Sequence, residues 1–193
     1  MSLSLTSRLD AVNTILTASG ESPVSSLSDT TADSANAESV LTEVLRDVQS
    51  EGWHFNTEKD VPFTPDSTKE ITLPANIAQI DLSQSDSSQV DLVQRGVRLY
   101  DRKARSYKFQ RVVKCDVVYL LPFEELPETA RRYVAVRAAR VFHDRFIGSE
   151  TAHRFTAEDE YRSRAALSAA NTSNEDCNIF TSNPLFWKLR RRS

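Results

Sequence analysis

The stretch VVKCDVVYLL (Val112–Leu121) indicates how the middle of this chain folds. Apolar and polar side chains alternate along it, with Val113, Cys115, Val117 and Tyr119 on one side and Lys114 and Asp116 on the other. A period of two places one face on a core and the other in solvent. The stretch therefore predicts a half-buried antiparallel strand.

Shorter runs of the same type come before this strand. They are ITL (71–73), IAQIDL (77–82), VDLV (90–93) and VRLY (97–100). Pro62, Pro65 and Pro74 interrupt any helix in this region, and YDRKARSY (Tyr100–Tyr107) is typical of a turn between two long strands. Residues 53–121 are therefore predicted to form a small antiparallel β domain.

Helical periodicity occurs on both sides of this β domain. Apolar residues recur at helical spacing in four segments, which we expect to be helices over residues 4–19, 33–51, 127–147 and 149–170. Their apolar stripes are Leu5, Leu9, Val12 and Leu16; Ala37, Leu41, Val44, Leu45 and Val48; Ala130, Val134, Ala138, Val141 and Phe142; and Ala157, Tyr161, Ala165 and Ala169. The last stripe is made mostly of small residues, which permits close packing but buries little surface.

The predicted fold class is therefore α+β. Two N-terminal and two C-terminal helices form an antiparallel bundle over residues 1–52 and 122–172, and the β domain of residues 53–121 is inserted into it. Residues 173–193 are expected to be an extended C-terminal tail.

The composition argues against several classes of function. Runs such as Val117–Leu121 are far too short to cross a bilayer, and MSLSLTSRLD lacks the features of a signal peptide. The four glycines are scattered, which argues against a phosphate-binding loop. Cys115 and Cys177 are expected to be free thiols, although one bridge between them stays open.

The sequence predicts no catalytic residue, no metal site and no cofactor. The three histidines are scattered, without the spacing of a zinc or di-iron site. Acidic residues near helix starts and on exposed faces, namely Glu124, Glu125, Glu158, Asp159 and Glu160, leave a polysaccharide-degrading tail hydrolase as an alternative. Such an enzyme needs two carboxyl groups held across a cleft.

The charges are unevenly distributed along the chain. Residues 1–94 carry 4 Lys+Arg against 15 Asp+Glu, and residues 95–193 carry 20 against 12. This polarity suggests a partner or a second copy with complementary charge, with two separately solvated surfaces as the alternative. Candidate residues facing a neighbouring subunit or DNA are the third-helix arginines Arg131, Arg132, Arg137 and Arg140. A DNA-contacting channel protein is a further alternative.

The C-terminal segment combines large aromatic residues with a basic cluster. Its candidate residues for docking on a partner or a neighbouring subunit are Phe180, Leu185, Phe186, Trp187, Lys188, Arg190 and Arg191. A terminal segment rarely carries several large aromatics unless it docks. Docking back onto its own domain is the alternative.

Several segments together resemble a known family. The segments that carry the resemblance are LDAVNTILTASGESPVSSL (9–27), NAESVLTEVLRDVQSEGWHFNTE (36–58), VRLYDR (97–102) and the helix 126–148. They are similar to the tail tubular protein A family, the head-to-tail adaptors of short-tailed, podovirus-type phages. The resemblance covers roughly residues 9–165. It does not extend to the tail after Asn171.

The resemblance implies a non-enzymatic virion protein that assembles in the host bacterial cytoplasm into a ring, dodecameric in the family, and acts as gatekeeper of the tail. Its expected partners are the portal protein, the nozzle formed by tail tubular protein B, and a tail fibre, with packaged DNA passing through the ring and no membrane involved. Gly20, Pro23, Trp53 and Phe55 match the family pattern as structural residues. The short polar loop between the first two helices is then expected to be a bundle tip that touches a neighbour or the portal.

Overall fold

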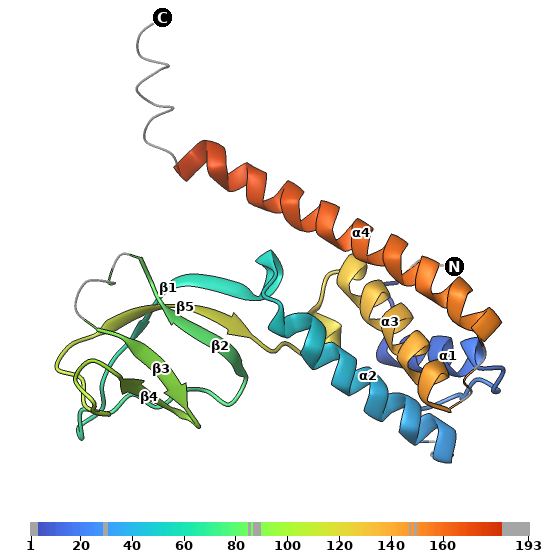
Figure 1. Cartoon of the computed structure of the whole chain (residues 1–193), viewed down its shortest axis with the longest axis horizontal. Helices are drawn as coiled ribbons and strands as arrows, with labels where there is room; N and C mark the ends of the chain where they lie inside the picture. Colours follow the sequence, from blue (N-terminus) through green and yellow to red (C-terminus); the bar gives the residue numbers. More distant parts are fainter. Residues whose placement is uncertain are drawn as a thin grey trace, which may run out of the picture. The chain divides into compact units, whose positions relative to one another are not determined.

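The structure, a computed structural model, describes residues 4–28, 31–84, 86, 90–146, 148 and 150–182, with the side chains of residues 157–174 in the last segment. The chain divides into two compact units (Figure 1). The helical unit comprises Met1–Leu45 and Phe123–Ser193, and the β unit comprises Arg46–Pro122. The first boundary lies within a helix rather than at residue 52, and the second lies next to the expected position.

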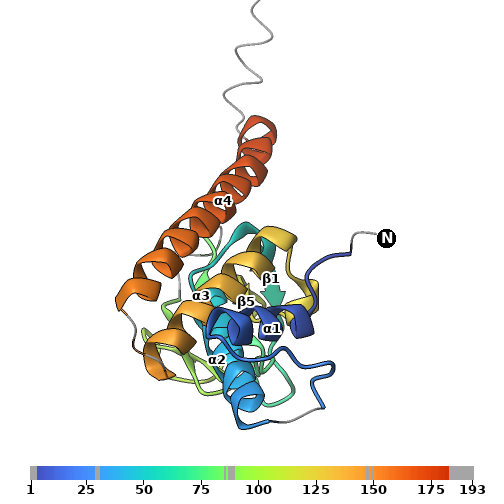
Figure 2. The ribbon, with the colours of Figure 1, turned by 90° about the vertical axis from the view of Figure 1, so that its right-hand side faces the viewer.

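Four α-helices are described. They are α1 (Arg8–Ala18), α2 (Ala32–Ser50), α3 (Glu128–Phe146) and α4 (Glu150–Ser182). Figure 2 shows α1 and α3 close together and α4 running along α3 within the helical unit. The class α+β is thus correct, while the antiparallel four-helix arrangement stays a prediction.

The start of α1 differs from the prediction because a capping box fixes it. The Ser7 hydroxyl accepts a hydrogen bond from the Asp10 N–H at 3.1 Å, and the Asp10 carboxylate accepts one from the Ser7 N–H at 3.0 Å. These bonds satisfy N–H groups that have no partner within the helix. Hydrogen bonds from Ser7 also lower the pKa of Asp10. Leu5 consequently lies outside the helix and is 55% exposed, so its assignment to the apolar stripe was wrong.

Most other residues of the predicted apolar stripes of α1, α2 and α3 are buried, while Leu9 and Val141 are half-buried. The buried apolar residues of these helices include Val12, Ile15 and Leu16 in α1, Ala37, Leu41, Val44, Leu45 and Val48 in α2, and Ala130, Val134, Ala138 and Phe142 in α3. Removing this apolar area from water is the main favourable contribution to folding.

The loop after α1 is held to the helix that precedes it. Gly20 has a φ of 81°, a left-handed conformation that favours glycine, and the Glu21 N–H donates to the Leu16 carbonyl at 2.9 Å. Further along, the amide of Asn13 donates to the Val24 carbonyl at 3.0 Å and accepts from the Val24 N–H at 2.8 Å. These contacts fix the loop as far as Val24.

The described residues of the β unit form two antiparallel sheets. Its strands are β1 (Thr57–Phe63), β2 (Ile77–Leu82), β3 (Leu92–Arg95), β4 (Arg98–Asp101) and β5 (Val113–Tyr119). The first sheet has the order β1-β5-β2, and β3 pairs with β4 in the second. The predicted strand, β5, lies in the middle of the first sheet and buries Val113, Cys115 and Val117, which confirms the alternation.

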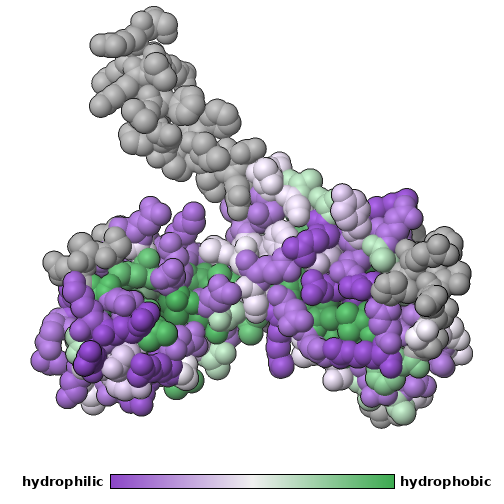
Figure 3. Space-filling view, in the orientation of Figure 1, coloured by the Kyte–Doolittle hydropathy of each residue, from purple (hydrophilic) through white to green (hydrophobic). Residues whose placement is uncertain are grey.

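The apolar core of the β unit brings together residues from both sheets and from the segments between them. Its buried members are Ile71, Leu73, Ile77, Leu99, Phe109, Val113, Cys115 and Val117. Burial raises the pKa of the Cys115 thiol to about 12, so this free thiol is protonated and unreactive in the folded protein. Apolar residues also gather on the visible surface of this unit (Figure 3).

Two side-chain amides tie the end of α2 to the end of β5. The Asn56 amide donates to the carbonyls of Gln49 (2.9 Å) and Tyr119 (2.8 Å), and its oxygen accepts from the Trp53 N–H (2.8 Å). Gln49 exchanges two hydrogen bonds with the backbone of Leu121, at 3.1 and 2.7 Å. The amides thereby satisfy backbone groups where helix changes to strand.

The C-terminal helix is longer than the sequence analysis predicted. α4 continues past Ala170 to Ser182, so residues 173–182 are helical and the expectation that they are extended was wrong. Asn171–Ser182 contains neither Gly nor Pro, so nothing there stops a helix already formed, and Pro184 follows two residues later. Residues 183–193 of the predicted tail lie outside the described residues.

We expect the change Asn56→Ala to lower the free energy of unfolding by about 2–4 kcal/mol, because it leaves three backbone groups without their partner in a buried site. Urea denaturation followed by far-UV circular dichroism measures this. The control is Gln79→Ala, which removes one exposed hydrogen bond to the Ser50 carbonyl and should cost less than about 1 kcal/mol. Equal effects of the two changes would contradict this role of Asn56.

Candidate interaction surfaces

Arg131 is a structural residue of the helical unit. It is 7% exposed, and its guanidinium donates to the carbonyls of Leu126 and Thr6, each at 2.8 Å, and to that of Glu124. The planar guanidinium thereby joins the segment before α1 to the turn before α3. Of the four arginines predicted to face a neighbour or DNA, Arg131 is thus used inside the chain, whereas Arg132 is exposed.

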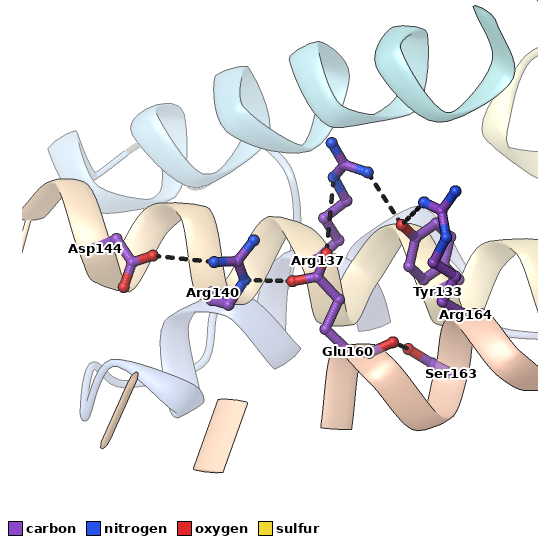
Figure 4. A network of polar contacts seen from close by, with 7 residues as sticks. All are labelled: Tyr133, Arg137, Arg140, Asp144, Glu160, Ser163 and Arg164. Atoms are coloured by element: carbon purple, nitrogen blue, oxygen red, sulfur yellow. Dashed lines mark hydrogen bonds and ion pairs between the residues drawn. The ribbon is translucent and has the colours of Figure 1, made fainter. Parts of the chain in front are cut away.

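The other two predicted arginines join α3 to α4 (Figure 4). Arg140 forms an ion pair with Glu160 and lies 3.5 Å from the carboxylate of Asp144, and Arg137 lies 4.0 Å from Glu160. The phenolic oxygen of Tyr133 accepts hydrogen bonds from Arg137 at 3.0 Å and from Arg164 at 2.9 Å. We call this group, Tyr133, Arg137, Arg140, Asp144, Glu160 and Arg164, the α3–α4 clamp.

Polar contacts provide much of the attachment of α4 to α3. Among the side chains described in α4, Leu167 is the large apolar one that is fully buried. The predicted small-residue stripe does not form the packing face, because Ala165 and Ala169 are exposed and Tyr161 is 76% exposed. The side of α4 that carries Glu160, Ser163 and Leu167 packs instead, so this prediction was wrong.

Basic residues are also concentrated in Arg95–Lys114, which belongs to the β unit. Three of its arginines form ion pairs within that unit: Arg98 with Glu70 at 2.9 Å, Arg102 with Asp91 at 3.7 Å, and Arg111 with Asp86 at 2.5 Å. Asp86 also accepts a hydrogen bond from the Lys114 N–H, and this bond and that from Arg111 lower the pKa of Asp86.

Part of the charge asymmetry along the sequence is paired within the folded chain. These three pairs, and the pair of Arg145 with Glu43, join an acid of residues 1–94 to an arginine of residues 95–193. The β unit as a whole contains eleven Lys+Arg and eleven Asp+Glu. The acidic and basic halves of the sequence are therefore not two charged halves of the molecule.

The predicted docking residues of the C-terminal segment fall largely outside the described part. The backbone of Phe180 belongs to α4. The other six lie beyond residue 182, outside the described residues: Leu185, Phe186, Trp187, Lys188, Arg190 and Arg191. Their role in docking stays a prediction.

Two other kinds of feature, a metal site and a membrane-spanning helix, can be judged for the described residues. Among them, no group of three or more His, Cys, Asp or Glu side chains is placed to hold a metal ion. Within the same residues no helix has the length and apolar character needed to cross a membrane. His143 is 3% exposed, with no hydrogen-bond partner for its Nδ1 in the described structure.

The sequence profile of the tail tubular proteins matches residues 9–177. The tail tubular protein A of Klebsiella phage KP34 is 30% identical over 189 residues, which are 96% of this chain and 96% of that relative. The chain belongs to the tail tubular protein family, and it is a structural protein of a phage virion tail.

We expect Glu160→Gln to destabilise the helical unit by about 1–3 kcal/mol, because it leaves two partly buried arginines without their shared carboxylate. Chemical denaturation measures the change. The matched control is Glu158→Gln in the same helix, whose ion pair with Arg162 is exposed and should contribute about 0.5 kcal/mol or less. If the control were as destabilising as Glu160→Gln, the clamp would not be what holds α4.

Proposed function

We propose that this protein is a head-to-tail adaptor, which forms a ring between the portal and the tail nozzle and helps to anchor tail fibres. The observation that carries the proposal is the match to the tail tubular proteins across nearly the whole chain, including both units. A relative that matches along nearly all of both chains favours the same place in the tail. The ring is expected to be dodecameric and to surround the packaged DNA.

The arrangement of α4 is consistent with a protein that binds partners over extended surfaces. Thr172, Ser173 and Asn174 are exposed, and the helix continues to Ser182. Exposed side chains along a helix offer a surface for another chain. We infer that the aromatic and basic residues at and beyond its end dock on the portal or on an adjacent subunit.

The proposed function is not enzymatic. Of the carboxylates considered for a hydrolase, Glu158 and Glu160 form ion pairs with arginines of the helical unit. Each of these carboxylates faces an arginine, whereas glycoside cleavage requires two carboxyl groups that face each other across a cleft.

The adaptor role is tested by electron microscopy of the purified protein mixed with the portal ring of its phage. The protein alone is expected to be mostly monomeric at modest concentration in size-exclusion chromatography with light scattering. With the portal, it should form a ring that shares the symmetry axis of the portal and stacks on one face of it. A portal that stays bare at saturating protein concentration would contradict the adaptor role.

Deletion of residues 178–193 should abolish attachment to the portal. It should change the thermal unfolding midpoint by less than about 3 °C, because a change of about 1 kcal/mol in the free energy of unfolding shifts the midpoint of a chain of this size by about 2–4 °C. Differential scanning calorimetry and portal co-sedimentation measure the two effects. The aromatic residues must offset the cost of ordering the segment, about 1–2 kcal/mol per residue of backbone. A midpoint lowered by about 10 °C or more would show that the segment belongs to the core of its own chain.

A further inference from the structure

The outer side of the β3–β4 ladder carries arginine and tyrosine side chains. Arg95 pairs with Arg98 across the ladder, and Val93 pairs with Tyr100. Side chains alternate between the two sides of a strand, so Arg98 and Tyr100 share one side, while Leu99 is buried on the other. Tyr107, which follows the ladder, packs against Tyr100. We call Arg95, Arg98, Tyr100 and Tyr107 the Arg–Tyr face.

Stacking contacts hold the four side chains of the Arg–Tyr face in place. The guanidinium carbon of Arg95 lies 3.6 Å from the centre of the Tyr100 ring, and that of Arg98 lies 4.5 Å from the Tyr107 ring. The two rings meet edge to face with their centres 4.9 Å apart. Cation–π and aromatic contacts of this type fix the groups before any partner binds. Binding then costs little side-chain entropy.

The composition of this face favours a protein partner over nucleic acid. Arginine and tyrosine are the residues most enriched at the energetic centres of protein interfaces. Val97, at the turn of the ladder, is 57% exposed and adds apolar surface. The carboxylates of Glu70 and Asp91, which pair with Arg98 and Arg102, would repel DNA phosphates.

The Arg–Tyr face has positive charge that its own unit does not neutralise. Arg95 is exposed, and within the described residues it has the Tyr100 ring as a partner but no ion pair. Arg102, at the end of the ladder, pairs with Asp91 at 3.7 Å with more than half of each side chain exposed, which is a weak interaction. The partner should therefore present carboxylates.

The helical unit presents two such carboxylates on a rigid turn. Glu124 and Glu125 are exposed in the short 3₁₀ helix η2 (Phe123–Glu125). Phe123 and Leu126 on either side are buried, at 0% and 2% exposure. Arg131 binds the carbonyls of Glu124 and Leu126. We call Glu124 and Glu125 the acidic elbow.

We propose that the Arg–Tyr face of one subunit docks on the acidic elbow of the next copy of this chain. The inference rests on the proposed ring, because a ring requires two different, complementary patches on each subunit. Each patch is fixed by its own unit before assembly, one by ring stacking and one by buried neighbours. Their opposite charges orient the contact head to tail.

The test uses two charge-reversed full-length proteins. The face variant is Arg95→Glu with Arg102→Glu, and the elbow variant is Glu124→Lys with Glu125→Lys; all four residues are exposed. Sedimentation velocity at low salt and high concentration measures the self-association of each. Like charges then oppose each other in both homogeneous samples, so we expect each to raise the dissociation constant of self-association by about a hundredfold or more.

The decisive measurement is the mixture of the two variants. An acidic face meets a basic elbow, and a basic face meets an acidic elbow, so the mixture should associate about as well as the native protein. The matched control, Arg46→Glu with Lys59→Glu, makes the same change in net charge at two other exposed sites of the β unit and should associate like the native protein.

Three outcomes would overturn the inference. The first is that the native protein does not self-associate at any attainable concentration. The second is that the mixture of the two variants does not recover association, and the third is that the face variant self-associates with the same dissociation constant as the native protein. A duplex DNA titration adds a fourth. If the native protein binds DNA and the face variant does not, while self-association is unchanged, the face serves nucleic acid. The proposed adaptor role is judged separately by the portal complex, since a complete ring of the face variant on the portal would reject this contact alone.

Discussion

The β unit depends on the hydrogen bonds that two side-chain amides make where α2 passes into the sheet. Gln49 and Asn56 bind the backbone of Leu121 and Tyr119 in the way that a neighbouring strand would. Without them, the end of a helix and the end of a strand would each leave polar groups unpaired in a buried place. The indole N–H of Trp53, which donates to the Val48 carbonyl at 2.7 Å, adds a further bond to the same helix end. This agrees with the structural role that the family resemblance implies for Trp53.

The helical unit is held by two different kinds of interaction. The helices α1, α2 and α3 bury apolar side chains, whereas α4 is attached to α3 largely through the clamp of arginines, carboxylates and one tyrosine. Partly buried ion pairs contribute less to stability than apolar packing, but they require a specific geometry. α4 is therefore positioned precisely enough to present an exposed side, while its attachment responds to salt and to competing charges. A helix of this kind suits a protein that must meet its partners during assembly.

Much of the fold follows from local pattern, and the exceptions have identifiable causes. The alternation in β5 and the apolar stripe of α2 predicted those elements well, since each buries one regular face. Strand β1 was missed because a bulge between Glu58 and Val61, with Asp60 at a φ of 57°, breaks its alternation, and Pro62 is tolerated on an edge strand. The sequence located the arginines of α3 but not their roles, because adjacent arginines on one helix point to different sides. Only the packing of α4 and of the segment before α1 shows that Arg131, Arg137 and Arg140 act within the chain.

The distribution of charge shows why a sum along the sequence is a poor guide to assembly. The two halves of the sequence differ strongly in charge, but the fold brings acids of the first half onto arginines of the second, and the β unit contains as many acids as bases. The imbalance along the sequence therefore does not give the β unit a net charge, and only charges within about 10 Å of each other interact strongly at physiological salt. Specific assembly must then come from small patches whose charges the fold leaves unpaired and whose side chains it holds rigid. Such patches have a practical advantage in a tail protein: each is too small to drive association at low concentration, and many of them act together once a symmetric neighbour positions the subunits.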